Sequence, residues 1–338
     1  MSPSTNLPVL KAKDFATDQD VRWCPGCGDY AILNAVQRVV AKTGASRENT
    51  VFISGIGCSS RFPYYMSTYG FHTIHGRAPG FVTGLKVASP DLDVWMVTGD
   101  GDGLSIGGNH LMHLLRRNVN VNAMLFNNRI YGLTKGQYSP TSEQGKRTKS
   151  TPMGSLDYPI DPVRMALAAG GTFVARSTDK DRGLTDVLTR AAAHRGTSFC
   201  EIYQNCNIFN DNAFEPLTGK DTREDNVLYL EHGKPMVFGK DVKKGLRMVG
   251  MRPEVVTLGE GGVTEDDLLF HDETNATLAM MLSNLHHPEF PEPLGVFYVE
   301  DRPCYEDQVA AQVDTATQKR GAGTLEALFN AGDTYTLS

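Results

Sequence analysis

Asp93-Val-Trp-Met-Val-Thr98 runs directly into Gly99-Asp100-Gly101-Asp102-Gly103, and this stretch decides the fold that the sequence predicts. The first six residues are mostly apolar, which is typical of a short buried strand. The glycines that follow let the backbone approach a bound phosphate closely, beside a carboxylate at the end of the strand. Residues 120–126 form a second expected strand, which ends at Asn127-Asn128, so that Asn128 follows Asp100 by 28 positions.

Short apolar strands alternate with helices on both sides of this stretch. Such alternation predicts an α/β fold, with a mostly parallel sheet and helices on both of its faces. Ligands of such sheets bind at the carboxyl ends of the strands, which is where the glycine and asparagine turns are expected to lie. The expected strands are residues 50–54, 93–98, 120–126, 172–175 and 198–203, and the expected helices are 31–42, 81–88, 108–117, 161–169 and 184–194.

The strand and helix pattern divides the chain into two parts. Residues 1–215 carry it and are expected to form the ligand-binding domain, within which the polar segment 139–155 is expected to be a mobile loop. Beyond Glu215 the pattern weakens into a charged stretch with scattered prolines. We therefore expect residues 216–338 to be a C-terminal extension that packs on the core or on a partner subunit.

Composition excludes several classes of protein. The 338 residues include 33 Lys and Arg against 39 Asp and Glu, a net charge of −6, whereas a general nucleic-acid binder usually shows a basic surplus. No apolar run approaches the length of a membrane-spanning helix, and the first residues lack the apolar core of a signal peptide. The sequence thus predicts a cytoplasmic protein that binds neither nucleic acid nor membrane.

Asp100 and Asn128 offer the oxygen ligands of a magnesium site. Mg²⁺ prefers an octahedron of oxygens, in which one or two protein groups are joined by substrate phosphates and water. The Asp100 carboxylate, the side-chain oxygen of Asn128, a nearby carbonyl and two diphosphate oxygens would supply it. Two glycine-rich turns capped by Asp and Asn are the alternative, but their matching positions after two strands favour a cofactor site.

Four of the six cysteines form a second candidate site. Cys24 and Cys27 make a CxxC pair, and Cys58 and Cys206 lie further along the chain. Four thiolates suit either Zn²⁺ or a [4Fe–4S] cluster, and sequence spacing does not separate the two. Cys200 falls in an expected strand and is interpreted as a core residue, while Cys304 is interpreted as a free thiol in a loop.

Three segments together resemble one known family. They are GDGDGLSIGGNHLMHLLRRNVNVNAMLFNNRIYGLTKGQYSPTS at 99–142, WCPGCGDYAIL at 23–33 and GIGCSSR at 55–61. The first is similar to the thiamine diphosphate-binding signature. All three resemble the β subunit of 2-oxoacid:ferredoxin oxidoreductases, particularly the 2-oxoglutarate type. The resemblance spans about residues 20–210. It implies a thiamine diphosphate-binding fold and a CoA-dependent, reversible oxidative decarboxylation, with 2-oxoglutarate and succinyl-CoA favoured.

The same resemblance assigns residues to each group. It implies that a [4Fe–4S] cluster binds the four cysteines and passes electrons to ferredoxin. Magnesium would be held by Asp100, Asn128 and the carbonyl of Ile130. Thiamine diphosphate would be lined by Ile56, Gly57, Cys58, Ser59, His75, Gly101, Asp102, Gly132 and Leu133. His75 and Arg61 are the candidate catalytic residues. Arg61 would pair with a substrate carboxylate, and a structural ion pair is its alternative.

The family's active site also needs a glutamate that activates the thiamine ring, and this glutamate comes from the α subunit. We therefore expect the chain to form half of an active site, with an α subunit, ferredoxin, CoA and a 2-oxo acid as its partners. The chain carries no CxxCxxCxxxC motif, so further clusters would belong to other chains. Two alternatives remain: a non-redox thiamine diphosphate subunit of the decarboxylase type, or a scaffold subunit, each with structural zinc.

Overall fold

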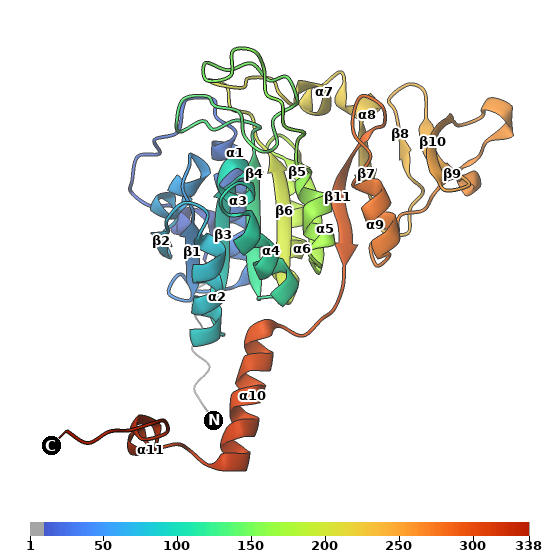
Figure 1. Cartoon of the computed structure of the whole chain (residues 1–338). Coiled ribbons are helices and arrows are strands. Elements are labelled where there is room, and N and C mark those ends of the chain that lie inside the picture. The colour runs from blue at the N-terminus through green and yellow to red at the C-terminus, as the bar shows by residue number, and fades with distance from the viewer. Residues whose placement is uncertain (1–9, 338) are drawn as a thin grey trace.

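The computed structural model of this chain describes residues 10–337, and its centre is a sheet of eight strands (Figure 1). The strand order is β2-β1-β3-β4-β6-β5-β11-β7. Neighbouring strands are parallel, except that β11 pairs antiparallel with β5. The strands are β1 (Thr50–Ser54), β2 (Tyr69–His72), β3 (Asp93–Gly99), β4 (Val121–Asn127), β5 (Phe173–Thr178), β6 (Thr197–Tyr203), β7 (Val227–Leu230) and β11 (Glu292–Val299).

Helices cover both faces of this sheet, because successive strand residues point to opposite sides. Val94 and Met96 of β3 pack into one apolar core, whereas Trp95 and Val97 pack into the other. The first core lies under α2 (Ala78–Ala88), α4 (Gly108–Arg117), α5 (Pro162–Ala168) and α9 (Ala276–Leu282), and the second under α1 (Asp29–Thr43) and α6 (Leu184–Ala193). The predicted α/β class with helices on both faces is confirmed.

Smaller elements complete the chain. They are α3 (Asp100–Leu104), α7 (Glu215–Thr218), α8 (Arg223–Asn226), the 3₁₀ turns Ala12–Phe15, Ser59–Tyr65, Glu260–Gly262 and Glu265–Asp267, and a small antiparallel sheet of β8 (Val237–Phe238), β9 (Lys244–Val249) and β10 (Arg252–Thr257). None of the helices in the described residues is long and apolar enough to cross a membrane.

The C-terminal part of the chain both enters the main sheet and leaves the body of the protein. Strands β7 and β11 belong to residues 216–338 yet form one end of the eight-stranded sheet. Helix α10 (Tyr305–Arg320) and helix α11 (Leu325–Phe329) then project away from the body, and every residue from Ala311 to Leu337 is exposed (Figure 1). The proposed division of the chain at residue 215 stays a prediction.

Strand pairing brings three loops to one edge of the sheet. Ser54 at the end of β1 pairs with Val97, and Gly99 at the end of β3 pairs with Phe126 of β4. These three strands are parallel, so their carboxyl ends point the same way. The segments 55–59, 99–103 and 127–133 therefore meet at this edge, as the sequence predicts.

Candidate functional site

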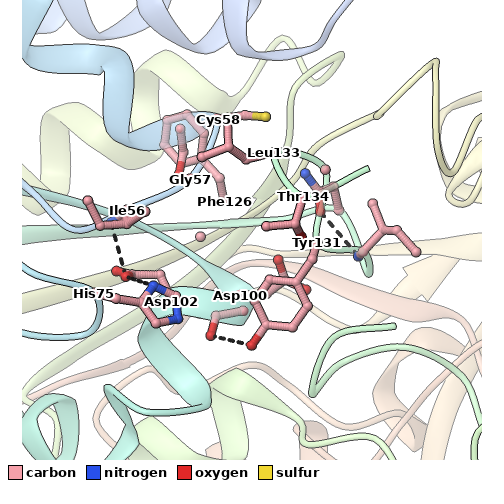
Figure 2. Close-up of a pocket in the computed structure, with 16 residues that line it drawn as sticks. Ile56, Gly57, Cys58, His75, Asp100, Asp102, Phe126, Tyr131, Leu133 and Thr134 are labelled. Carbon is pink, nitrogen blue, oxygen red and sulfur yellow. Dashed lines mark hydrogen bonds and ion pairs between the residues drawn. The ribbon is translucent and has the colours of Figure 1, made fainter. Parts of the chain in front are cut away.

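A cavity lies where these three loops meet (Figure 2). Figure 2 shows Cys58 and Leu133 on one side of the cavity and His75, Asp100 and Asp102 on the other. All nine residues that the resemblance assigns to the thiamine diphosphate line it, as do the three assigned to magnesium: Ile56, Gly57, Cys58, Ser59, His75, Gly101, Asp102, Gly132, Leu133, Asp100, Asn128 and Ile130.

Asp102 organises the cavity through hydrogen bonds to the protein. Its Oδ1 accepts from the backbone N–H of Ile56 at 3.0 Å and from that of Gly76 at 2.8 Å, while its Oδ2 accepts from the hydroxyl of Thr98 at 2.7 Å. The carboxylate is buried. It ties the loop after β1 to the loop before α2, so its observed role is to shape the wall of the cavity.

Asp102 also fixes the orientation of His75. The Nδ1 atom of His75 lies 2.8 Å from Oδ1 of Asp102, and the ring is about one-third exposed. A carboxylate at this distance favours the proton on Nδ1. In the neutral ring the Nε2 atom is then an acceptor, available to a group bound in the cavity.

Asp100 is held by hydroxyl groups from a distant loop. Its Oδ2 accepts from Ser139 Oγ at 2.5 Å and from Thr141 Oγ1 at 2.6 Å. Burial raises the pKa of the Asp100 carboxyl, and these hydroxyls oppose that rise by stabilising the anion. Both hydroxyl residues lie in the segment 139–155, which has neither helix nor strand but is closed by backbone hydrogen bonds such as Gly145 N–H to Ser155 O.

The asparagine turn faces Asp100 across the cavity. The side-chain oxygen of Asn128 accepts from the N–H of Ile130 at 3.2 Å, and its amide donates to Gln204 at 2.8 Å. Arg129 has a φ of 55°, a left-handed conformation that bends the chain sharply. This turn brings the Asn128 side chain and the Ile130 residue to the same cavity as the Asp100 carboxylate.

The residues present fit a magnesium ion and a diphosphate. One buried carboxylate, one carboxamide oxygen and a carbonyl are hard oxygen donors of the type that Mg²⁺ prefers. The hydroxyl of Ser59 is buried in the cavity wall and has no hydrogen-bond partner among residues 10–337, so it is free to donate to a bound anion. A Cβ on Gly101 would lie 2.2 Å from the ring of Tyr131, which explains why glycine is needed there.

Two of the four candidate cluster cysteines lie beside the cavity. The Sγ atoms of Cys58 and Cys206 are 3.4 and 3.7 Å from the point where a Cβ on Gly132 would lie. Burial raises the pKa of the Cys58 thiol to about 12, with further contributions from Asp29 and from the thiols of Cys206 and Cys24. Such a thiol is protonated at neutral pH, and a bound metal would stabilise its anion.

The remaining cysteines lie in different surroundings. Cys27 is half-buried and accepts from the Gln204 amide at 3.3 Å, while Cys24 is exposed. Within residues 10–337, no three His, Cys, Asp or Glu side chains converge closely enough to hold a metal ion. Cys200 and Cys304 are buried elsewhere.

Arg61 lies outside the cavity. Its guanidinium donates to the carbonyl of Arg22 at 2.8 Å and lines a separate hollow together with Asp18 and Asp20. Its contact with a substrate carboxylate therefore stays a prediction. Three further residues of the site were not expected from the sequence. Ser139 and Thr141 donate to Asp100, and Tyr131 lines the cavity and donates through its hydroxyl to the carbonyl of Gly101 at 2.9 Å. Only the tyrosine had a signal, since it lies next to Ile130.

Comparison with known proteins shows the family of this chain. Residues 55–202 match the family model described as "Thiamine pyrophosphate enzyme, C-terminal TPP binding domain". The chain is 53% identical to the 2-oxoglutarate oxidoreductase subunit KorB of Mycobacterium tuberculosis, over 99% of this chain and 90% of that protein. It is 44% identical to 2-oxoacid:ferredoxin oxidoreductase 2, subunit beta, of Aeropyrum pernix, over 59% of this chain and 64% of that protein.

A solved structure is also similar over nearly the whole chain. The 2-oxoglutarate:ferredoxin oxidoreductase from Magnetococcus marinus, with 2-oxoglutarate, coenzyme A and succinyl-CoA bound, superposes with a TM-score of 0.76. It is 33% identical and covers 96% of this chain and 97% of that one. The fold and the cavity thus define a thiamine diphosphate enzyme. Within that class, the chain belongs to the family of 2-oxoacid:ferredoxin oxidoreductase β subunits and is part of an oxidoreductase.

Proposed function

We propose that this chain is the β subunit of a cytoplasmic 2-oxoglutarate:ferredoxin oxidoreductase. The reaction converts 2-oxoglutarate and CoA reversibly to succinyl-CoA and CO₂, and two electrons leave through a [4Fe–4S] cluster to ferredoxin. The observation that carries the proposal is the cavity at the ends of β1, β3 and β4, in which donors for a metal and a diphosphate lie beside two cysteine thiols. The relatives named for 2-oxoglutarate support the choice of substrate.

In this proposal Asp100, Asn128 and the Ile130 carbonyl would hold Mg²⁺, which would neutralise the charge of the diphosphate. When bound, thiamine diphosphate supplies the carbon nucleophile and the electron sink for decarboxylation. The protein's own contribution is to orient the bound cofactor and substrate and to enclose them. The loops that Asp102 fixes form one wall, and the Ser59 hydroxyl donates into the cavity. His75 presents Nε2 toward the bound cofactor or substrate as a proton acceptor.

The cluster is proposed to bind Cys24, Cys27, Cys58 and Cys206. The proximity of Cys58 and Cys206 to Gly132, which lines the cavity, supports a short path for electrons from the site of decarboxylation. Zinc on the same thiolates is the alternative, and it would leave the subunit without redox function. The visible spectrum of anaerobically purified protein separates the two, because an iron–sulfur cluster is coloured and Zn²⁺ is not.

An α subunit is proposed as the partner that completes the active site. The cavity contains two buried aspartates, Asp100 and Asp102, but no glutamate lines it in the described residues. The thiamine ring therefore requires its activating glutamate from another chain.

Co-purification with the α subunit tests the whole proposal. The complex is expected to reduce ferredoxin when given 2-oxoglutarate, CoA, Mg²⁺ and thiamine diphosphate, and to stop when any one of them is left out. The β subunit alone, loaded with the same cofactors, is expected to be inactive. Turnover by the single chain, or the absence of turnover by an iron-loaded complex, would contradict the proposal.

A further inference from the structure

A cluster of buried charges lies directly behind the metal-binding loops. The guanidinium of Arg176 on β5 is fully buried and contacts three carboxylates. Its Nε lies 2.6 Å from Glu201 on β6, its Nη1 lies 2.9 Å from Glu292 on β11, and its Nη2 lies 2.7 Å from Asp161 at the start of α5. One positive charge thus faces three acidic groups, and a buried cluster of this kind is costly unless each group is precisely hydrogen-bonded.

Glu201 is the member of this cluster that faces the metal site. One of its oxygens accepts from Arg176, and the other accepts from the side-chain amide of Asn127 at 2.7 Å. Both oxygens therefore have a donor, and the carboxylate is fixed in position. Asn127 ends β4 and immediately precedes Asn128, the candidate magnesium ligand.

Asn127 connects the two halves of the candidate metal site. Its side-chain oxygen accepts from the N–H of Arg129 at 3.1 Å, which holds the turn carrying Asn128 and Ile130. The same oxygen lies 2.9 Å from the hydroxyl of Thr141. That hydroxyl has one hydrogen, and since Arg129 already donates to Asn127, the hydrogen is available to the charged Asp100 carboxylate at 2.6 Å. Asn127 thus contacts Arg129, which belongs to the turn that carries Asn128, and Thr141, which holds Asp100.

We infer that Glu201, held by Arg176 and acting through Asn127, is a positioning residue for the magnesium–diphosphate site. The inference rests on the proposed function. Glu201 touches neither metal nor cofactor; it fixes the angle at which the asparagine turn faces Asp100. Groups that orient metal ligands from behind usually contribute about 10- to 100-fold to metal affinity. The paired asparagines then have separate tasks, since Asn128 binds the metal and Asn127 sets the turn.

Glu292 provides a matched control. Like Glu201 it is buried and contacts Arg176, but its other contacts go to Tyr203 and His286 rather than to Asn127. A purely structural role for the cluster predicts that losing either carboxylate has the same effect. A positioning role predicts that only the loss of Glu201 weakens Mg²⁺ binding.

The experiment compares Glu201→Gln with Glu292→Gln in the complete complex, stripped of metal and cofactor. Both oxygens of Glu201 accept a hydrogen bond, so the amide must lose either Arg176 or Asn127. At saturating thiamine diphosphate, we expect Glu201→Gln to raise the Mg²⁺ concentration for half-maximal binding about tenfold by calorimetry, and Glu292→Gln to leave it unchanged. Both variants should lower the melting temperature of the metal-free complex. Equal effects on Mg²⁺, or none from Glu201→Gln, would overturn the inference.

A second variant serves if the buried glutamates are needed for folding. Asn127→Ser removes the amide that donates to Glu201, while its hydroxyl oxygen can still accept from the N–H of Arg129. Weaker Mg²⁺ binding in Asn127→Ser supports the inference, and wild-type binding overturns it. The wild-type complex separates this outcome from failure of the proposed function. If it binds no thiamine diphosphate at any Mg²⁺ concentration, the proposed function fails and the inference falls with it.

Discussion

Replacing Asp102 should separate the shape of the cavity from its charge. Both oxygens of the carboxylate contact donors of the protein. Oδ1 contacts Ile56, Gly76 and His75, and Oδ2 contacts Thr98. Asp102→Asn can keep the three donors on Oδ1, because an amide oxygen can occupy that position. The new amide nitrogen then faces Thr98, whose hydroxyl can turn to accept from it. Asp102→Ala loses all four contacts.

The magnitude follows from counting what each variant leaves unpaired. Hydrogen bonds to a charged group contribute about 1.5–3 kcal/mol and neutral ones about 1 kcal/mol, so each retained bond weakens in Asp102→Asn. A neutral amide is also less costly to bury than a carboxylate, which offsets most of this loss, and we expect the free energy of unfolding to fall by about 1 kcal/mol. Asp102→Ala strands the buried N–H of Gly76 and releases the loops at Ile56 and His75. Each stranded donor costs about 1–3 kcal/mol, and we expect a total of about 2–4 kcal/mol.

Denaturant unfolding and calorimetric titration with thiamine diphosphate measure the two effects side by side. We expect Asp102→Asn to bind the cofactor nearly as well as wild type, and Asp102→Ala to lose both stability and affinity. The reasoning is refuted if Asp102→Asn keeps wild-type stability yet loses the cofactor as completely as Asp102→Ala. That result would mean that the negative charge itself contacts the metal or the cofactor.

Three further predictions concern the metal, the cluster and acid stability. Asp100→Asn should weaken Mg²⁺-dependent cofactor binding at least tenfold in calorimetry while iron content stays at the wild-type level, because a neutral amide competes poorly with the hydration of Mg²⁺; unchanged affinity would exclude Asp100 as a ligand. Cys206→Ser should lose the reduced-state EPR signal and iron, whereas Cys200→Ser in the core should keep both; the reverse pattern would exclude Cys206. Burial alone would raise the pKa of Glu292, but Arg176 and hydrogen bonds lower it to about 2 from an ordinary 4.5. Its contribution to stability is therefore present above about pH 4.5 and lost as the pH falls toward 2. In Glu292→Gln, the urea concentration at the midpoint of unfolding should therefore fall less between about pH 5 and pH 3 than it does in wild type. The same fall in both proteins would contradict this.

The sequence predicts the centre of this fold well because several signals agree there. In β3, an apolar run and a glycine stop favour the same strand, and the structure buries all of its residues except the first and the last. The spacing from Asp100 to Asn128 corresponds to one strand–helix–strand unit, so both side chains must reach the same edge. Because the two strands are parallel, the spacing of Asp100 and Asn128 in the sequence was enough to predict that both side chains lie at the same site.

Other parts of the fold and of the site could not be predicted, because their positions depend on contacts between residues that are far apart in the sequence. Ser139 and Thr141 come from a polar segment that looks solvated in sequence, and only the folded chain shows that both are buried against Asp100. Strand β11 contains Pro293 and Gly295, which disfavour strands in general, and its place is decided by packing between β5 and β7. Arg61 is close to Cys58 in sequence, yet the 3₁₀ turn that begins at Ser59 delivers its guanidinium to a different hollow.

The insertion of β11 beside β5 has a consequence for how the chain is made. Strand β5 ends at Thr178, but its outer neighbour begins only at Glu292, more than a hundred residues later. At about 5–20 residues per second, roughly 6–23 s of synthesis separate the two strands. During that interval the edge of β5 exposes unpaired backbone groups that could recruit another nascent chain. Slow growth at low temperature and abundant chaperones should therefore raise the soluble yield. A chain that stops at residue 215 should aggregate, because the strand that closes this edge is never made.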